Sequence, residues 1–202
     1  MSTAPVLAPT PATLLDRLWP AAENRLLRNA FLAVAGSLLL TLSAKIIVPF
    51  WPVYMNMQTF AVMLIGAAFG WRLGLATVLL YLAEGATGLP VFTGTPEKGI
   101  GLAYMAGPTG GYLAGFVVAV AIVGWFAERG FDKFFFAMGA IMLAADAALF
   151  ALGLGWMGVL FGWDKPILEW GLFPFIYGDL FKIALAAAIV ALGWQVLGKA
   201  RD

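Results

Sequence analysis

The sequence contains no cysteine and no histidine, and only 11% of its 202 residues are charged. Without cysteine the chain forms no disulfide and has no thiolate, and without histidine it lacks the commonest general base and transition-metal ligand. It also has no G-x-x-x-x-G-K-S/T loop for nucleotide phosphates. These absences argue against a catalytic triad and against ATP hydrolysis by this chain, and we expect no metal and no cofactor.

Polar residues are too few to cover a soluble globule. Hydrophobic residues make up 62% of the sequence, where a soluble domain has about 45–50% apolar and 25% charged residues. The mean hydropathy is +0.92. The net charge of +1, without a basic patch, argues against nucleic acid as a partner. The chain is therefore predicted to be an integral membrane protein in contact with the lipid bilayer.

Six apolar stretches are predicted to be membrane spans, the second of them short. They cover about 30–48, 58–70, 73–85, 107–127, a stretch from 134, and 171–198. With the N-terminus inside, eight basic residues are cytoplasmic and three are external, in accord with the positive-inside rule. The predicted fold is all-α, with six transmembrane helices and both termini cytoplasmic. We expect a cytoplasmic segment at 1–29, partly disordered or interfacial, a membrane domain at 30–198 and a tail at 199–202. Four residues of the first segment are predicted to lie on the membrane surface: Leu14, Leu15, Leu18 and Trp19.

Two ionisable residues interrupt the last apolar stretch. Asp179 and Lys182 are three positions apart, which places them on one face of a helix. An ionised group in hydrocarbon costs at least about 2.5–3.5 kcal/mol, so such residues face a cavity or each other. The pair either locks the helix bundle or offers an acceptor and a cation to a small polar ligand.

Two further acids lie at membrane depth. Glu84 is either a helix-end carboxylate that reaches interfacial water or part of a pocket. Asp146, flanked by alanines, must face the bundle interior, where it makes a structural hydrogen bond or lines a pocket.

Glycines and Pro90 prevent a regular helix through residues 85–94, although that stretch is apolar. Irregular backbone at membrane depth must be buried in protein or line a cavity, so we interpret this stretch as a lid or pocket wall. Small residues in the first span, among them Ala33, Gly36 and Ser37, would allow another helix to approach closely.

Several motifs occur together in a characteristic order. They are Ser43-Ala44-Lys45-Ile46, Gln58-Thr59-Phe60-Ala61-Val62, Gly88-Leu89-Pro90-Val91-Phe92, Gly107-Pro108-Thr109-Gly110-Gly111-Tyr112-Leu113 and Pro174-Phe175-x-x-Gly178-Asp179-x-x-Lys182. From about residue 30 to the C-terminus the chain resembles the BioY family, the biotin-binding S-components of energy-coupling factor (ECF) transporters. It departs from the family at 52–59, where members often have Pro-Val-Pro-x-Thr-x-Gln-Thr.

The resemblance implies high-affinity biotin capture from outside a prokaryotic cell (inner) membrane by a multi-pass protein that is not an enzyme. The implied partners are a transmembrane coupling subunit and two ATP-binding subunits that hydrolyse ATP. The candidate biotin-binding residues are Asp179, Lys182, Thr59, Phe92, Tyr112, Tyr177, Glu84 and Asp146. The first-span face with Ala33, Gly36 and Ser37 is the candidate docking surface for the coupling subunit.

Three other functions fit parts of the pattern. One is an S-component for another vitamin, such as thiamine or riboflavin. Another is a membrane-embedded enzyme that uses Asp146 and Asp179 as acid and base, which the lack of histidine disfavours. The third is a small-solute channel.

Overall fold

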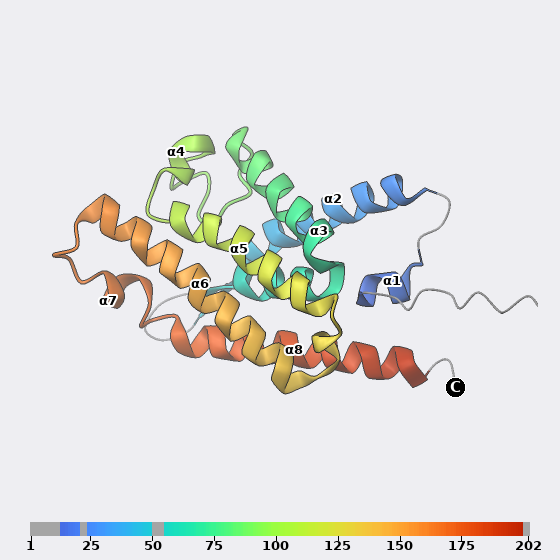
Figure 1. The fold of residues 1–202 in the computed structure, drawn as a ribbon. Coiled ribbons are helices and arrows are strands. Elements are labelled where there is room, and N and C mark those ends of the chain that lie inside the picture. Colours follow the sequence, from blue (N-terminus) through green and yellow to red (C-terminus); the bar gives the residue numbers. More distant parts are fainter. Residues whose placement is uncertain (1–12, 21–23, 50–54, 200–202) are drawn as a thin grey trace, which may run out of the picture.

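A computed structural model of the chain describes residues 13–20, 24–49 and 55–199. Helices dominate this part of the chain (Figure 1). In chain order the elements are α1 (Leu14–Leu18), α2 (Arg25–Lys45), β1 (Ile47–Val48), β2 (Met55–Asn56), α3 (Gln58–Ala86), α4 (Gly101–Met105), α5 (Gly110–Ala127), the 3-10 helix η1 (Phe131–Lys133), α6 (Phe135–Phe161), α7 (Ile167–Gly171) and α8 (Ile176–Lys199). The two short strands pair antiparallel, Ile47 with Asn56 and Val48 with Met55.

Five helices are long and apolar enough to cross a membrane: α2, α3, α5, α6 and α8. Six spans were predicted, and the difference lies in α3. Its backbone leaves the helical conformation at Gly70, where φ is 78° and ψ is 176°. The arms at 58–69 and 71–86 correspond to the second and third predicted spans. At 1.5 Å per residue they measure about 18 and 24 Å, shorter than the ~30 Å hydrocarbon core.

The two arms of α3 lie antiparallel. Gln58 at its start donates from Nε2 to the hydroxyl of Tyr81 in the returning arm, 2.7 Å away. A Cβ atom built on Gly74 would lie 3.6 Å from Cα of Gly66. Since the arms turn back on each other at Gly70, the five long helices contain all six apolar segments that the sequence predicts.

Residues 13–18 of the N-terminal segment pack against the membrane domain. Thr13 caps α1, and Leu14 is only 8% exposed and packs against Gly193 of α8. Arg17 donates to the carbonyl of Leu197 at 3.1 Å. We expected Leu14 to lie on the membrane surface, but its apolar side chain joins the protein core. Residues 1–12 and 21–23 fall outside the described ranges.

The predicted boundary between residues 29 and 30 falls inside a helix. α2 begins at Arg25, and Arg28 in its first turns is buried and forms an ion pair with Asp16, 3.0 Å away. This ion pair allows a charged residue to be buried in the first turns of α2, ahead of the apolar part of the helix.

The chain turns at Gly70 and at 128–133 lie at the same end of the bundle as α1 and the last turns of α8 (Figure 1). Glu128 accepts a hydrogen bond from the backbone N–H of Trp71 at 3.2 Å, which joins the two turns. α4 and α7 lie at the opposite end. The two ends therefore divide as the topology prediction requires, with α1 and the last turns of α8 at one end.

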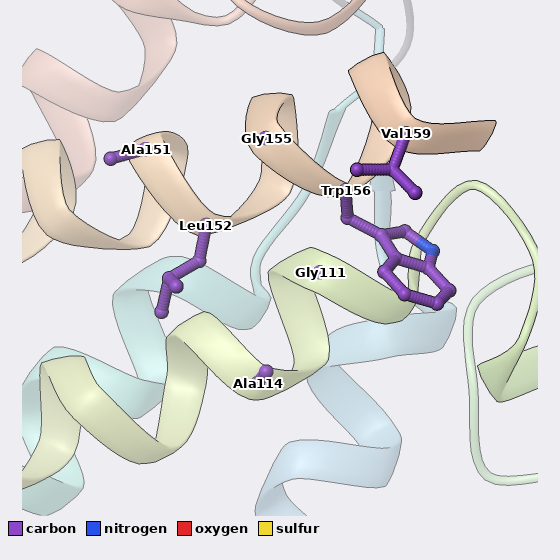
Figure 2. A pocket seen from close by; sticks show the side chains of 7 residues that line it. All are labelled: Gly111, Ala114, Ala151, Leu152, Gly155, Trp156 and Val159. Carbon is purple, nitrogen blue, oxygen red and sulfur yellow. The ribbon is translucent and has the colours of Figure 1, made fainter. Parts of the chain in front are cut away.

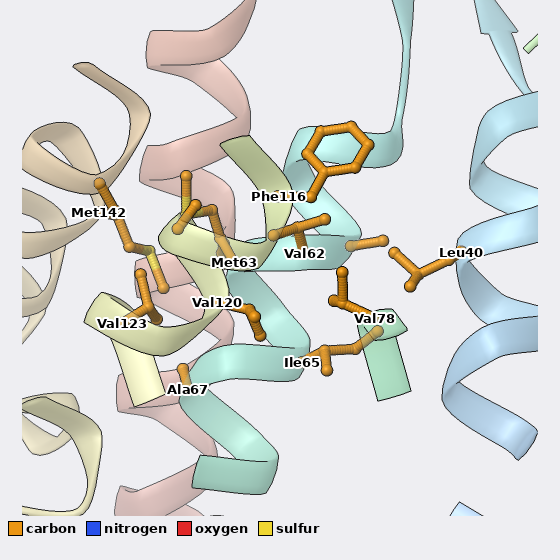
Figure 3. Close-up of a cluster of buried hydrophobic side chains, with 14 of the residues drawn as sticks. Leu40, Val62, Met63, Ile65, Ala67, Val78, Phe116, Val120, Val123 and Met142 are labelled. Carbon is orange, nitrogen blue, oxygen red and sulfur yellow. The ribbon is translucent and has the colours of Figure 1, made fainter. Parts of the chain in front are cut away.

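The hydrophobic core lies where α2, α3, α5 and α6 meet (Figure 3). Glycines let the helices approach closely, because a Cβ on Gly66 would lie 3.0 Å from Val123 and one on Gly115 2.9 Å from Leu149. Fully buried side chains from these helices, including Leu40, Val62 and Val120, fill the centre. This packing holds the ends of α3 and α8 in place around the polar site described next.

Candidate functional site

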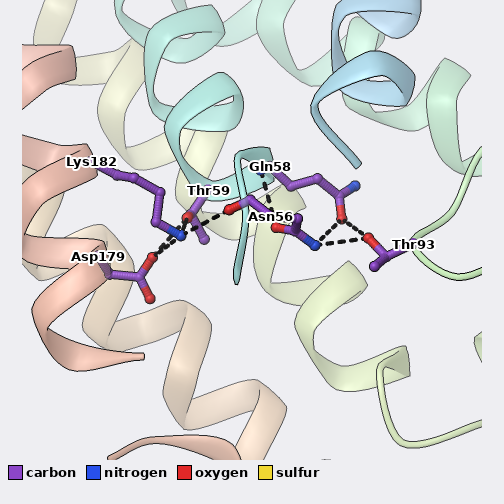
Figure 4. Close-up of polar contacts among 6 residues, drawn as sticks. All are labelled: Asn56, Gln58, Thr59, Thr93, Asp179 and Lys182. Atoms are coloured by element: carbon purple, nitrogen blue, oxygen red, sulfur yellow. Dashed lines mark hydrogen bonds and ion pairs between the residues drawn. The ribbon is translucent and has the colours of Figure 1, made fainter. Parts of the chain in front are cut away.

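Asp179 and Lys182 form an ion pair in the first turns of α8. Lys182 Nζ lies 2.5 Å from Asp179 Oδ1, and the two side chains are only 7% and 5% exposed. The separation of three residues on a helix brings both side chains to one face, as the sequence predicts (Figure 4). The pair is enclosed by protein.

Thr59, in the first turn of α3, lies between the two charges. Its hydroxyl donates to Asp179 Oδ1 at 2.8 Å and accepts from Lys182 Nζ at 2.7 Å. Lys182 also donates to the backbone carbonyl of Asn56 at 3.2 Å. The ammonium group, which has three N–H donors, thus has three acceptors. Three of the predicted site residues, Thr59, Asp179 and Lys182, come together.

A second set of polar side chains continues the site toward residues 91–95, called the 91–95 segment. Asn56 Nδ2 donates to Thr93 Oγ1 at 2.8 Å, and Thr93 Oγ1 donates to Gln58 Oε1 at 2.8 Å (Figure 4). Tyr81 donates to the carbonyl of Val91 at 3.2 Å. These bonds tie the 91–95 segment to the start of α3, directly beside Thr59.

Tyr104 of α4 holds the same segment from the other side. Its hydroxyl donates to the carbonyl of Thr93 at 2.8 Å. Burial raises the pKa of the Tyr104 hydroxyl above its ordinary value of 10.0, so the group keeps the proton that it donates. Its ring stacks on Phe92, with 4.9 Å between the ring centroids.

Lys45 at the end of α2 is a third anchor. Its Nζ donates to the carbonyls of Phe92 and Thr95, at 3.0 and 2.8 Å, and to the Thr95 hydroxyl at 3.0 Å. A lysine at the end of an apolar span ordinarily extends toward the membrane interface and needs no partner in the protein. The backbone partners of Lys45 lie in an irregular segment, so no spacing rule would have found them.

A model of the BioY family matches residues 13–199. The chain belongs to the BioY family. The match begins ahead of residue 30, where the resemblance by motifs began, and so includes α1.

Individual proteins agree with this assignment. The chain is 33% identical over 151 residues to a protein described as a probable biotin transporter BioY from Pyrococcus horikoshii, covering 75% of this chain and 86% of that protein. It is 32% identical over 151 residues to the biotin transporter BioY of Thermotoga maritima, with the same two shares.

A crystal structure of the S-component for biotin from an ECF-type ABC transporter has the same fold. Its TM-score is 0.70 at 25% identity, over 85% of this chain and 93% of that one. The chain is thus an all-helical, multi-pass membrane protein with the S-component fold.

Phe92 lies in the protein core, whereas a residue of a pocket wall would face the pocket. Its side chain is 1% exposed, and its ring lies between Tyr104 and Tyr81 and against Gly85. The ring anchors the 91–95 segment in the protein core. Direct contact between this ring and a ligand stays a prediction.

Tyr112, Tyr177 and Glu84 are not part of the cluster around Lys182. Tyr112 donates to the carbonyl of Gly171 at 2.9 Å and so links α5 to α7. Tyr177 is 74% exposed, because a residue two positions before Asp179 points to the opposite side of the helix. Glu84 accepts a hydrogen bond from the Ser37 hydroxyl of α2. The structure therefore places these three side chains outside the cluster of Thr59, Asp179 and Lys182.

Two of the three predicted docking residues face inward. A Cβ on Gly36 would lie 2.6 Å from Thr77 of α3, and Ser37 is fully buried. Ala33 is half-buried. These small residues serve the close contact between α2 and α3. The surface that α2 presents outward includes a run of exposed apolar residues: Phe31, Val34, Ala35, Leu38 and Leu42.

A groove of about 290 Å³ between α5 and α6 is separate from this polar cluster (Figure 2). It is lined by Gly111, Ala114, Ala151, Leu152, Gly155, Trp156 and Val159. Trp156 donates from Nε1 to the carbonyl of Gly107 at 2.8 Å. The lining has no ionisable side chain, so the groove lacks the chemistry of the cluster around Lys182.

Proposed function

We propose that this chain captures biotin at the outer face of a prokaryotic cell membrane and delivers it for uptake as the S-component of an ECF-type transporter. The observation that carries the proposal is the buried cluster of Asp179, Lys182 and Thr59, which lies in the first turns of α3 and α8. Membership of the BioY family supports biotin as the ligand.

The chemistry of biotin complements this cluster. Biotin has a ureido ring with two N–H donors and one carbonyl acceptor, an apolar bicycle and a valerate carboxylate. The side chain of Asp179 contacts Lys182 and Thr59 through Oδ1. Its Oδ2 would therefore accept a hydrogen bond from a ureido N–H. Charge-assisted bonds of this kind are strong in a dry pocket. Lys182 would donate to the ureido carbonyl or to the carboxylate, in exchange for its longest contact, the one to Asn56.

The 91–95 segment would close the site. Lys45, Tyr81 and Tyr104 fix its backbone, and Asn56 connects it to the carbonyl that Lys182 contacts. A ligand that replaces the carbonyl of Asn56 as a partner of Lys182 would free Asn56 from that contact. Since Asn56 also bonds Thr93, the ligand would act on the 91–95 segment through this one residue.

Uptake would require a transmembrane coupling subunit and two ATP-binding subunits. The chain has no phosphate-binding G-x-x-x-x-G-K-S/T loop, so the ATP-binding subunits would hydrolyse ATP. The coupling subunit would dock on the exposed apolar face of α2, next to the half-buried Ala33.

Calorimetry on detergent-purified protein tests the proposal. Wild type should bind biotin one to one, and Asp179→Asn and Lys182→Ala should each weaken binding by more than tenfold, about 1.4 kcal/mol. Tyr177→Phe is the matched control, since Tyr177 is on the same helix but exposed, and it should bind like wild type. Binding of thiamine or riboflavin in place of biotin, by well-folded protein, would contradict the proposal.

A further inference from the structure

Asp146 in α6 has a buried carboxylate without a hydrogen-bond donor among the described residues. The residue is 8% exposed, and its Oδ1 is buried and unpartnered. Its neighbours in sequence are Ala144, Ala145, Ala147 and Ala148, none of which has a polar side chain. An ionised carboxylate in such a place is unfavourable unless a donor reaches it.

The register of α6 against α8 places Asp146 beside the ligand cluster. The two helices run antiparallel. A Cβ built on Gly139 of α6 would lie 4.0 Å from the side chain of Ala187 in α8. Ahead of α6 in the chain, Asp132 of η1 accepts a hydrogen bond at 2.5 Å from Trp194, which lies further along α8. Because both helices rise equally per residue, the position of α6 that carries Asp146 lies at the level of Leu180. Leu180 lies between Asp179 and Lys182 in the sequence, so Asp146 is at the level of these two charged residues of α8.

Lys182 does not neutralise both acids. Its ammonium group already contacts Asp179, Thr59 and Asn56. The group of three ionisable residues therefore combines two carboxylates with one ammonium, on two facing helices. In hydrogen-bonding terms the site offers two acceptors and one donor.

We propose that Asp146 is a second acceptor of the ligand site and receives one ureido N–H of biotin, while Asp179 receives the other. This inference rests on the proposed function. The ureido group presents two N–H donors on either side of a carbonyl, which is the complement of two carboxylates and an ammonium. Biotin thus supplies the donor that the buried Asp146 carboxylate lacks within the described chain, and α6 and α8 hold the ring between them.

The test combines substitutions with biotin analogues. Asp146→Ala should weaken biotin binding at least tenfold, and Asp146→Asn, which keeps one acceptor oxygen, should weaken it less. Biotin methylated on one or the other ureido nitrogen loses one N–H. Methylation of the nitrogen that bonds Asp146 should lower the affinity of wild type for biotin. In Asp146→Ala the same methylation should lower the affinity by a factor at least tenfold smaller, because the bond is already absent.

Thermal unfolding of the ligand-free variants separates a ligand contact from a structural one. Removing a carboxylate that only the ligand pairs should leave the unfolding midpoint unchanged or higher. Asp132→Asn is the matched control, since this buried acid of the same seam bonds Trp194 instead. It should leave biotin affinity unchanged.

Three results would overturn the inference while the proposed function stands. They are wild-type affinity for biotin in Asp146→Ala, equal methylation effects in wild type and variant for both nitrogens, and failure of both Asp146 variants to fold. Failure of wild type to bind biotin at all would instead remove the proposed function.

Discussion

Gln58 and Tyr81 stand at opposite ends of α3 and are joined by a hydrogen bond of 2.7 Å between Gln58 Nε2 and the Tyr81 hydroxyl. Both side chains are buried, and the Tyr81 hydroxyl also donates to the carbonyl of Val91. One hydroxyl therefore closes the hairpin of α3 and anchors the 91–95 segment to it.

Replacing Tyr81 by Phe should lower the free energy of unfolding by about 1–3 kcal/mol, because it leaves a buried donor on Gln58 and a buried carbonyl on Val91 without a partner. The unfolding midpoint of detergent-purified protein measures this loss. Tyr177→Phe removes an exposed hydroxyl and should leave the midpoint unchanged. Equal midpoints for wild type and Tyr81→Phe would contradict the role assigned to the hydroxyl.

The ion pair of Asp179 and Lys182 makes single and double substitutions differ. Asp179→Asn leaves a buried ammonium and Lys182→Met a buried carboxylate, and each should destabilise the chain by about 3–5 kcal/mol. The double variant removes both charges and should be more stable than either single variant. Unfolding midpoints of the four proteins test this order. Strictly additive losses would show that the two charges do not stabilise each other.

Gly70 allows the turn between the arms of α3. Its φ of 78° and ψ of 176° belong to a region that is essentially restricted to glycine, and a Cβ there would overlap the Glu128 side chain. Gly70→Ala should destabilise the protein by at least about 1–3 kcal/mol. Gly155→Ala is the control, because among the described residues no atom outside its own helix lies within 4 Å of its Cβ position. It should be neutral or stabilising by about 0.5–1 kcal/mol. Similar midpoints for both variants would argue against a strained turn.

Asp132 in η1 should make stability depend on pH. Burial raises the pKa of its carboxyl from 3.8 to about 6, against the opposing effects of the Trp194 hydrogen bond and the Lys133 charge. The folded chain holds this proton to a higher pH than the unfolded chain. Its contribution to stability is therefore full below pH 4 or so, declines as the pH rises, and is lost above about pH 6.

Unfolding midpoints of wild type and Asp132→Asn between pH 4 and 7.5 provide the measurement. The substitution should remove this part of the pH dependence, because asparagine does not ionise but keeps an oxygen for Trp194. A difference between the two proteins that stays constant with pH would rule out the titration of Asp132 as its source.

The exposed face of α2 leads to a prediction about uptake. Ala35 is a small residue on this face, where another helix can approach closely. Ala35→Trp should reduce biotin uptake by cells that contain the ATP-binding and coupling subunits, while biotin binding by the purified chain stays unchanged. Ala151→Trp, at an exposed position of α6, should spare both. Normal uptake by the Ala35 variant would exclude this face as the docking surface.

The sequence alone determined the class of protein and the position of its charged pair. An apolar content of 62% leaves no soluble alternative, and ionisable residues within an apolar run are rare enough to be noticed individually. The turn at Gly70 was also predictable, because an Arg and glycines interrupt two apolar stretches there. The outward direction of Tyr177 follows from helix geometry and could have been predicted from its spacing to Asp179.

Only the tertiary structure decided which neighbours each residue meets. Small residues allow close packing against any helix, so the sequence could not tell that Gly36 and Ser37 face α3 and not a partner subunit. The anchors of the 91–95 segment depend on Lys45 and Tyr104, whose partners are backbone carbonyls of an irregular segment. A carbonyl is present at every residue, so composition and periodicity contain no signal for such contacts. The fold alone selects them.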